Sequence, residues 1–129
     1  MPFFLEFDEV LSLQRVQVER YGGSVGVRDR GLLESALAMP QAAFGGQFLH
    51  ADLFEMAAAY LFHIVQNHPF IDANKRTGTD AAVTFLTMNG VELTAAIPPF
   101  KEMVLSVAQG KTSKSAVAEF FRKHSRKAR

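Results

Sequence analysis

The sequence predicts an all-α protein, a compact bundle of six helices with one small hairpin. Its 129 residues suit one compact domain, and 48% of them are hydrophobic, which is enough to build a core. Apolar residues recur at helical spacing in six segments, which are separated by turns rich in glycine or proline. Since only short stretches favour extended structure, a bundle is the class that accommodates the pattern.

The first two helices are predicted from their caps and their breaks. Asp8 is expected to cap a helix of about twelve residues, which Gly22-Gly23 would stop. Asp29 is expected to cap a second, shorter helix that Pro40 ends.

The segment from residue 41 to 50 places glycines beside aromatic residues, a composition that predicts a mobile flap or a small hairpin. Its centre consists of Phe44, Gly45, Gly46, Gln47 and Phe48.

The third helix, residues 52–66, is apolar on nearly every face, which predicts the buried centre of a bundle. Pro69 prevents this helix from continuing through His68. Helical spacing then resumes and runs to Asn89-Gly90, a pair that favours a left-handed stop.

Two further helices complete the chain. Pro98-Pro99 are expected to open a helix that reaches about Gln109, after a short extended stretch at residues 91–93. Thr112 or Ser113 is expected to cap the last helix, which would run to about His124. The basic tail, from about residue 123 to 129, is expected to be mobile, and the whole chain to form a single domain.

Composition excludes several classes of function. The absence of cysteine rules out disulfides, thiol catalysis and zinc–thiolate sites. The net charge is only +1, so we expect no direct binding of nucleic acid. No secretion signal or membrane-spanning stretch is apparent, and we expect a cytoplasmic protein that makes no membrane contact.

The segment from His68 to Arg76 carries the chemistry. It places an imidazole, a carboxylate, an amide and two cations within nine residues, at the start of a predicted helix. The first amides of a helix lack partners and carry the positive end of its dipole, so they attract anions. Lys75 and Arg76 in that first turn are unfavourable unless an anion compensates, which predicts a phosphate ligand.

Each residue of the motif has a functional and a structural interpretation. His68 is the candidate general base for a hydroxyl, and otherwise a hydrogen-bonded structural histidine. Asp72 is the candidate Mg²⁺ ligand, and otherwise the N-cap of the following helix. Asn74 is a candidate phosphate contact, and otherwise a turn residue.

The two cations of the motif are candidate phosphate ligands, with solvated surface charges as the alternative. Arg76 offers a planar fork of donors and Lys75 a point charge. Phe70 is expected to anchor the loop in the core, and Pro69 to stiffen its entry.

The motif resembles the signature of the Fic/Doc superfamily, which reads His-x-Phe-x-Asp/Glu-Gly-Asn-Gly-Arg-x-x-Arg. The chain matches at five positions and differs at three, where it has Ala73, Lys75 and Thr79. These differences resemble the death-on-curing (Doc) toxin branch, whose signature contains Asp-Ala-Asn-Lys-Arg-Thr. The likeness extends over roughly residues 8 to 122.

The resemblance implies a six-helix Fic/Doc fold and a kinase. Doc-type toxins bind ATP and Mg²⁺, are understood to phosphorylate a threonine of translation elongation factor Tu, and are blocked by an antitoxin that covers the active-site cleft. The resemblance implies that His68 is the base and Asp72 the Mg²⁺ ligand, with phosphate held by Asn74, Lys75 and Arg76. The flap would hold the target peptide by strand addition.

Two alternatives remain open. One is a Fic-type adenylyltransferase, which transfers AMP and uses a glycine at the Lys75 position and an arginine at the Thr79 position. The other is a non-catalytic binding module of the same fold. An inhibitory helix of the Fic type is not expected, because Ser115–Phe120, the nearest match, suits a core helix.

Overall fold

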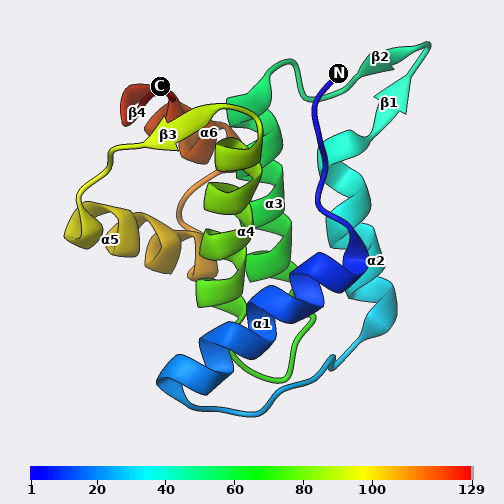
Figure 1. Ribbon diagram of the computed structural model, residues 1–129, viewed down its shortest axis with the longest axis vertical. Helices are drawn as coiled ribbons and strands as arrows, with labels where there is room; N and C mark the ends of the chain where they lie inside the picture. The colour runs from blue at the N-terminus through cyan, green and yellow to red at the C-terminus, as the bar shows by residue number, and fades with distance from the viewer. Residues whose placement is uncertain (129) are drawn as a thin grey trace.

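Residues 1–128 are described by the computed structural model and form six α-helices, with a central antiparallel pair (Figure 1). This pair consists of α3 (Leu53–Asn67) and α4 (Asn74–Met88), and the motif loop joins them. Residues 56–61 of α3 are all buried, as the apolar faces of this segment predict. The prediction of an all-α six-helix bundle is confirmed. In the described part of the chain, no helix is both long and apolar enough to cross a bilayer.

Helix α1 (Phe7–Tyr21) and helix α2 (Arg30–Ala38) flank the central pair. The predicted cap of α1 is wrong, because Asp8 lies inside the first turn and Glu6 is the N-cap. The backbone N–H of Glu6 donates to Oε1 of Glu9 at 2.8 Å, which stabilises that end. The predicted cap of α2 is confirmed, since Oδ1 of Asp29 accepts from the N–H of Leu32 at 3.0 Å. A 3₁₀ turn, Met39–Gln41, follows α2.

Helices α5 (Ile97–Ala108) and α6 (Lys114–Lys123) pack on the other side of the pair. Pro98 and Pro99 occupy the first turn of α5, where their missing N–H groups need no partner. Ser113 caps α6, because its hydroxyl accepts from the N–H of Ala116 at 3.1 Å. Thr112 instead donates its hydroxyl to Ser106 at 2.6 Å.

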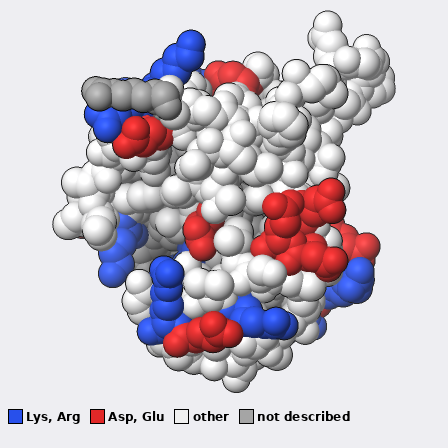
Figure 2. Space-filling view, viewed as in Figure 1, with Lys and Arg blue, Asp and Glu red and all other residues white. Residues whose placement is uncertain are grey.

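Two short antiparallel ladders complete the fold. Strand β3 (Val91–Leu93) pairs with β4 (Ser125–Lys127), and the guanidinium of Arg126 binds the carboxylate of Glu92 at 3.0 and 3.2 Å. Part of the basic tail therefore forms β4, position 129 lies outside the described residues, and the mobility of the tail stays a prediction. The other ladder, β1 (Ala43–Phe44) with β2 (Gln47–Phe48), is the predicted hairpin. It projects from the molecule and carries no charged residue (Figure 2).

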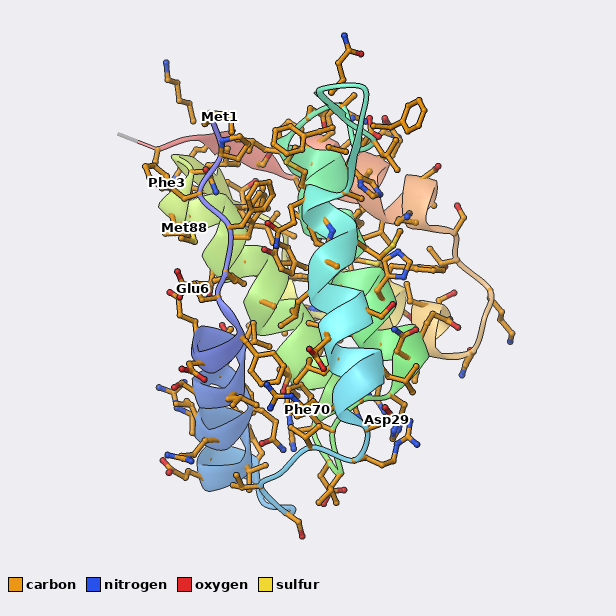
Figure 3. The ribbon with its side chains drawn as sticks, turned by 90° about the vertical axis from the view of Figure 1, so that its right-hand side faces the viewer. Met1, Phe3, Glu6, Asp29, Phe70 and Met88 are labelled. Atoms are coloured by element: carbon orange, nitrogen blue, oxygen red, sulfur yellow. The ribbon has the colours of Figure 1, made fainter. Side chains whose placement is uncertain are left out.

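The N-terminal segment begins at the hairpin end of the bundle and runs along α4 to α1, with Phe3 and Met88 close to each other (Figure 3). The side chain of Asn89 fastens it, accepting from the N–H of Phe3 at 2.8 Å and donating to its carbonyl at 2.9 Å. Phe70 lies at the opposite end of the molecule, beside Asp29. The bundle thus has a hairpin end and a motif end, separated by the length of α3.

Candidate functional site

The motif loop begins and ends in left-handed backbone conformations. His68, the C-cap of α3, has φ 52°, and Ala73, the N-cap of α4, has φ 65°. The left-handed conformation of a residue other than glycine is less stable than the right-handed one by about 1–2 kcal/mol. The surrounding contacts must therefore hold both residues in place. The two turns reverse the chain, and α4 therefore starts beside the end of α3 with its first amides free.

Residues 22–29, which we call the clasp, hold the loop from outside. The carbonyl of Pro69 accepts from the backbone N–H groups of Arg28 and Asp29, at 2.7 and 3.0 Å. The N–H of Ile71 donates to the carbonyl of Gly26 at 3.0 Å. These bonds form a short antiparallel bridge beside the loop, where Val27 opposes Phe70.

Gln14 ties the clasp to the loop from the buried face of α1. Its side chain is 1% exposed, and Nε2 donates to the carbonyls of Ser24 and Asp72, both at 3.1 Å. Its Oε1 accepts from the N–H of Gly26 at 3.3 Å. Sequence reasoning missed Gln14, although its place between Val10 and Val18 puts a polar residue on an apolar helical stripe.

The loop is anchored from inside by two apolar residues of the motif. Phe70 is fully buried in the core, and Pro69 is buried too. This burial is the arrangement that the expected anchoring role requires. His68 itself is exposed to solvent.

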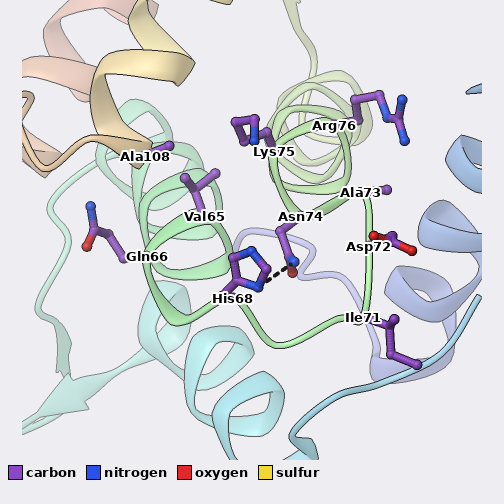
Figure 4. A pocket seen from close by; sticks show the side chains of 10 residues that line it. All are labelled: Val65, Gln66, His68, Ile71, Asp72, Ala73, Asn74, Lys75, Arg76 and Ala108. Atoms are coloured by element: carbon purple, nitrogen blue, oxygen red, sulfur yellow. Dashed lines mark hydrogen bonds between the residues drawn. The ribbon is translucent and has the colours of Figure 1, made fainter. Parts of the chain in front are cut away.

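Asn74 is 5% exposed, and its amide is used within the loop. Its Oδ1 accepts from the N–H of Phe70 at 2.9 Å, and its Nδ2 donates to the carbonyl of Phe70 at 3.0 Å. Nδ2 also lies 3.0 Å from Nδ1 of His68 (Figure 4). Both amide hydrogens of Asn74 therefore face partners within the loop, and its contact with phosphate stays a prediction.

The motif surrounds a pocket of about 670 Å³ at the start of α4 (Figure 4). Its polar lining comes mainly from the motif, and its apolar lining comes from the motif loop and from the ends of α3 and α5. The lining residues are Val65, Gln66, His68, Ile71, Asp72, Ala73, Asn74, Lys75, Arg76 and Ala108. All five polar residues singled out in the motif therefore meet at one cavity, and the imidazole faces it from α3.

Asp72 does not cap α4, since the N-cap is Ala73. Its Oδ2 instead accepts from the N–H of Ser24 at 2.7 Å, which holds the carboxylate at the rim of the pocket. Mg²⁺ commonly binds one or two protein carboxylates together with phosphate oxygens. Among the described residues, no group of three or more acidic or histidine side chains could enclose a metal. The role of Asp72 as a ligand of Mg²⁺ stays a prediction.

The two cations lie at the other side of the pocket, in the first turn of α4. Lys75 is exposed. Nη2 of Arg76 donates to the carbonyl of Gly22 at 3.3 Å, and the guanidinium lies 5.1 Å from the ring centre of Tyr21. Nε of Arg76 is buried without a hydrogen-bond acceptor. A buried donor of this kind is costly, and an anionic oxygen would satisfy it.

A second cavity, of about 690 Å³, adjoins the first between α1, α4 and α5. Its lining is largely apolar and includes Tyr21, Val83, Phe100, Val104 and Leu105. Lys75 and Arg76 line both cavities, so the two cavities meet at the cations of the motif.

The hairpin does not border the motif pocket. It lies at the N-terminal end of α3, whereas His68 lies at the C-terminal end. A helix of 15 residues is about 22 Å long. A bound peptide would have to cover that distance to touch both, so the role of Phe44–Phe48 in holding a target stays a prediction.

The Fic-like inhibitory match in α6 also lies away from the motif. Glu119 forms an ion pair with Arg122, whose guanidinium binds Asp52 at 2.8 Å. Asp52 is the N-cap of α3, at the end opposite His68. This exposed glutamate therefore supports the arginine that joins α6 to α3.

Comparison with known proteins gives a consistent result. The model of a family described as "Fic/DOC family" matches residues 4–86. The "Protein kinase doc" of Escherichia phage P1 is 35% identical over 116 residues, which cover 90% of each chain. The "Toxin Doc" of Mycolicibacterium smegmatis is 42% identical over 95 residues, which cover 74% of this chain and 71% of that protein.

Proposed function

The chain belongs to the Fic/DOC family, where it is similar to Doc toxins, and on that basis we propose that it is a toxin that acts as a protein kinase. It transfers the γ-phosphate of ATP to a threonine hydroxyl of a protein target, and the proposed target is translation elongation factor Tu. The observation that carries the proposal is the single pocket in which His68, Asp72, Lys75 and Arg76 meet.

The proposed reaction needs one base and one anion site. The hydroxyl oxygen of the target attacks the γ-phosphorus, and the bond from that phosphorus to the bridging oxygen of the β-phosphate breaks. ADP leaves with the bonding electrons. The hydroxyl proton passes to the imidazole of His68, which later releases it to solvent. General-base help of this kind is worth about 10²–10⁴ in rate.

The start of α4 would stabilise the transferred phosphoryl group. Its free backbone amides and the positive end of its dipole favour anionic oxygens. Lys75 and Arg76 add two cations, and Nε of Arg76 lacks an acceptor that a phosphate oxygen would supply. Asp72 would hold Mg²⁺, which neutralises phosphate charge when bound.

Two residues favour transfer of phosphate over transfer of AMP. Lys75 replaces the glycine that leaves room for the α-phosphate in Fic-type adenylyltransferases. Thr79 replaces the arginine that grips the outer phosphates, and its hydroxyl donates to the carbonyl of Lys75 at 2.8 Å. A hydroxyl used within its own helix turn does not replace a guanidinium.

We also propose that a partner antitoxin covers the pocket in the cytoplasm, where the target works. The apolar cavity between α1, α4 and α5 supports this, because it offers a surface continuous with Lys75 and Arg76. A partner seated there would cover both cations.

Expression in a bacterial host tests the toxin proposal. We expect growth arrest with the wild-type chain and none with His68→Ala. His124→Ala, which removes a histidine at the end of α6, should still arrest growth. Arrest that persists in His68→Ala at equal protein level would favour a binding module instead.

A further inference from the structure

The amide of Asn74 can be oriented in only one way. Its Oδ1 faces the N–H of Phe70 at 2.9 Å, and its Nδ2 faces the carbonyl of Phe70 at 3.0 Å. Turning the amide over would set oxygen against oxygen and N–H against N–H, in a side chain that is 5% exposed. The backbone of Phe70 therefore fixes Nδ2 as the atom that faces His68.

This orientation determines which nitrogen of His68 carries a proton. Nδ2 of Asn74 can only donate, and it lies 3.0 Å from Nδ1 of His68. Nδ1 must therefore accept, so the proton of the neutral ring is on Nε2. The donor of the imidazole is then Nε2, the ring nitrogen that is not joined to Asn74 in Figure 4.

We propose that Asn74 is a positioning residue that holds resting His68 in its Nε2–H form, so that His68 serves as a base only after the Asn74–His68 contact opens. A neutral ring in this form has its one free lone pair on Nδ1, where Asn74 covers it. To accept a hydroxyl proton at Nε2, the ring must lose the Nε2 proton to solvent and take one on Nδ1. The consequence for proton transfer rests on the proposed kinase function, whereas the protonation pattern does not.

Nitrogen NMR of the imidazole rings tests the inference directly. Spectra of ¹⁵N-labelled protein are recorded at about pH 8.5, well above the ordinary histidine pKa of about 6.5. His124 is an internal reference, because its Nδ1 lies 2.8 Å from the carbonyl of Phe120 and must donate. We expect His68 to show a proton on Nε2, opposite to His124. A proton on Nδ1 of His68, or an averaged signal, would overturn the inference.

Asn74→Asp separates positioning from general structural support. The carboxylate keeps an acceptor for the N–H of Phe70 but offers an acceptor to Nδ1, so we expect the His68 proton to move to Nδ1. Asn89→Asp is the matched control, since Asn89 also binds both backbone groups of one residue, Phe3. It should leave the His68 signals unchanged.

If the Asn74→Asp protein folds and its His68 still carries the proton on Nε2, Asn74 does not determine the protonation pattern of the ring. If this variant does not fold, the wild-type spectrum still decides. If His68 carries its proton on Nε2 but the protein shows no kinase activity, the proposed function is wrong and this inference stands. If the protein is a kinase but His68 carries its proton on Nδ1, this inference is wrong and the proposed function stands.

Discussion

The guanidinium of Arg28 donates from Nε to the main-chain carbonyl of His68 across 2.7 Å, and from Nη2 to the carbonyl of Asn67 across 3.1 Å. The last carbonyls of a helix lack partners within it and carry the negative end of its dipole. Arg28 satisfies two of them at the end of α3. A cation of the clasp, outside the motif, thus holds the backbone of the residue that bears the imidazole.

Removing this cation should loosen the site. We expect Arg28→Ala to lower the free energy of unfolding by about 1–2 kcal/mol, through loss of two charge-assisted hydrogen bonds, and to slow phosphate transfer. Urea unfolding and a transfer assay measure the two effects. Arg15→Ala, at an exposed position of α1, should change stability by less than about 0.5 kcal/mol. Equal effects of the two substitutions would contradict a clasping role for Arg28.

Asp72 should determine the Mg²⁺ concentration that phosphate transfer needs. We expect Asp72→Asn to raise the Mg²⁺ concentration for half-maximal transfer by about tenfold or more, because an amide replaces the carboxylate ligand. The amide oxygen can still accept from Ser24, so the clasp should stay closed. Asp80→Asn is the control, since Asp80 binds Gln17 and lines only the second cavity. If Asp72→Asn leaves the Mg²⁺ dependence of transfer unchanged, Asp72 is not a ligand of the metal.

His63 should make the fold sensitive to acid. Burial, followed by the charge of Lys114 and by His50, lowers the pKa of His63 from 6.5 to about 4. Nζ of Lys114 lies 3.1 Å from Nε2 of the ring. As the pH falls below about 6.5, His63 becomes protonated in the unfolded chain but stays neutral in the folded chain. The free energy of unfolding therefore decreases as the pH falls from about 6.5 toward 4.

Urea unfolding at about pH 7.5 and pH 5 measures this loss. We expect roughly 1–2 kcal/mol, after discounting the shift because the ring is only half-buried. His63→Gln should reduce the difference between the two pH values, whereas His124→Gln should retain it. A difference that survives intact in His63→Gln would assign the acid sensitivity to another group.

The left-handed turn at Ala73 carries strain that glycine would relieve. Ala73→Gly should raise the free energy of unfolding by up to about 1 kcal/mol, since the gain of about 1–2 kcal/mol in the folded state is partly offset by a more flexible unfolded chain. Ala116→Gly, at an exposed right-handed position in α6, should instead destabilise by about 0.5–1 kcal/mol. Differential scanning calorimetry of both variants checks the opposite signs. If both substitutions lower the free energy of unfolding, the backbone at Ala73 is not strained in the way proposed.

The parts of the molecule that follow from local chemistry were predictable. Asp29 and Ser113 cap their helices through hydrogen bonds to residues three positions ahead, and Pro98-Pro99 open α5. The polar residues of the motif are close in sequence, so their meeting at one pocket was also predictable.

The contacts that were missed join distant segments. Gln14 reaches across 58 positions to the carbonyl of Asp72, and β4 pairs with a strand more than thirty residues earlier. The apolar stripe of α1 marks Gln14 as unusual, but the partners of Gln14 and of β4 follow only once the helices are placed. The same applies to the hairpin: its turn was predicted from local composition, but its distance from His68 depends on where α3 begins and ends.

Transfer from ATP labelled in its γ- or its α-phosphate tests the central claim most directly. Each labelled ATP is incubated with the protein, Mg²⁺ and purified elongation factor Tu, and His68→Ala serves as the matched control. We predict label on a threonine of the target from γ-labelled ATP only, with a rate that falls about 10²–10⁴-fold in His68→Ala. Label from α-labelled ATP on the target would contradict phosphate transfer and assign the pocket to transfer of AMP.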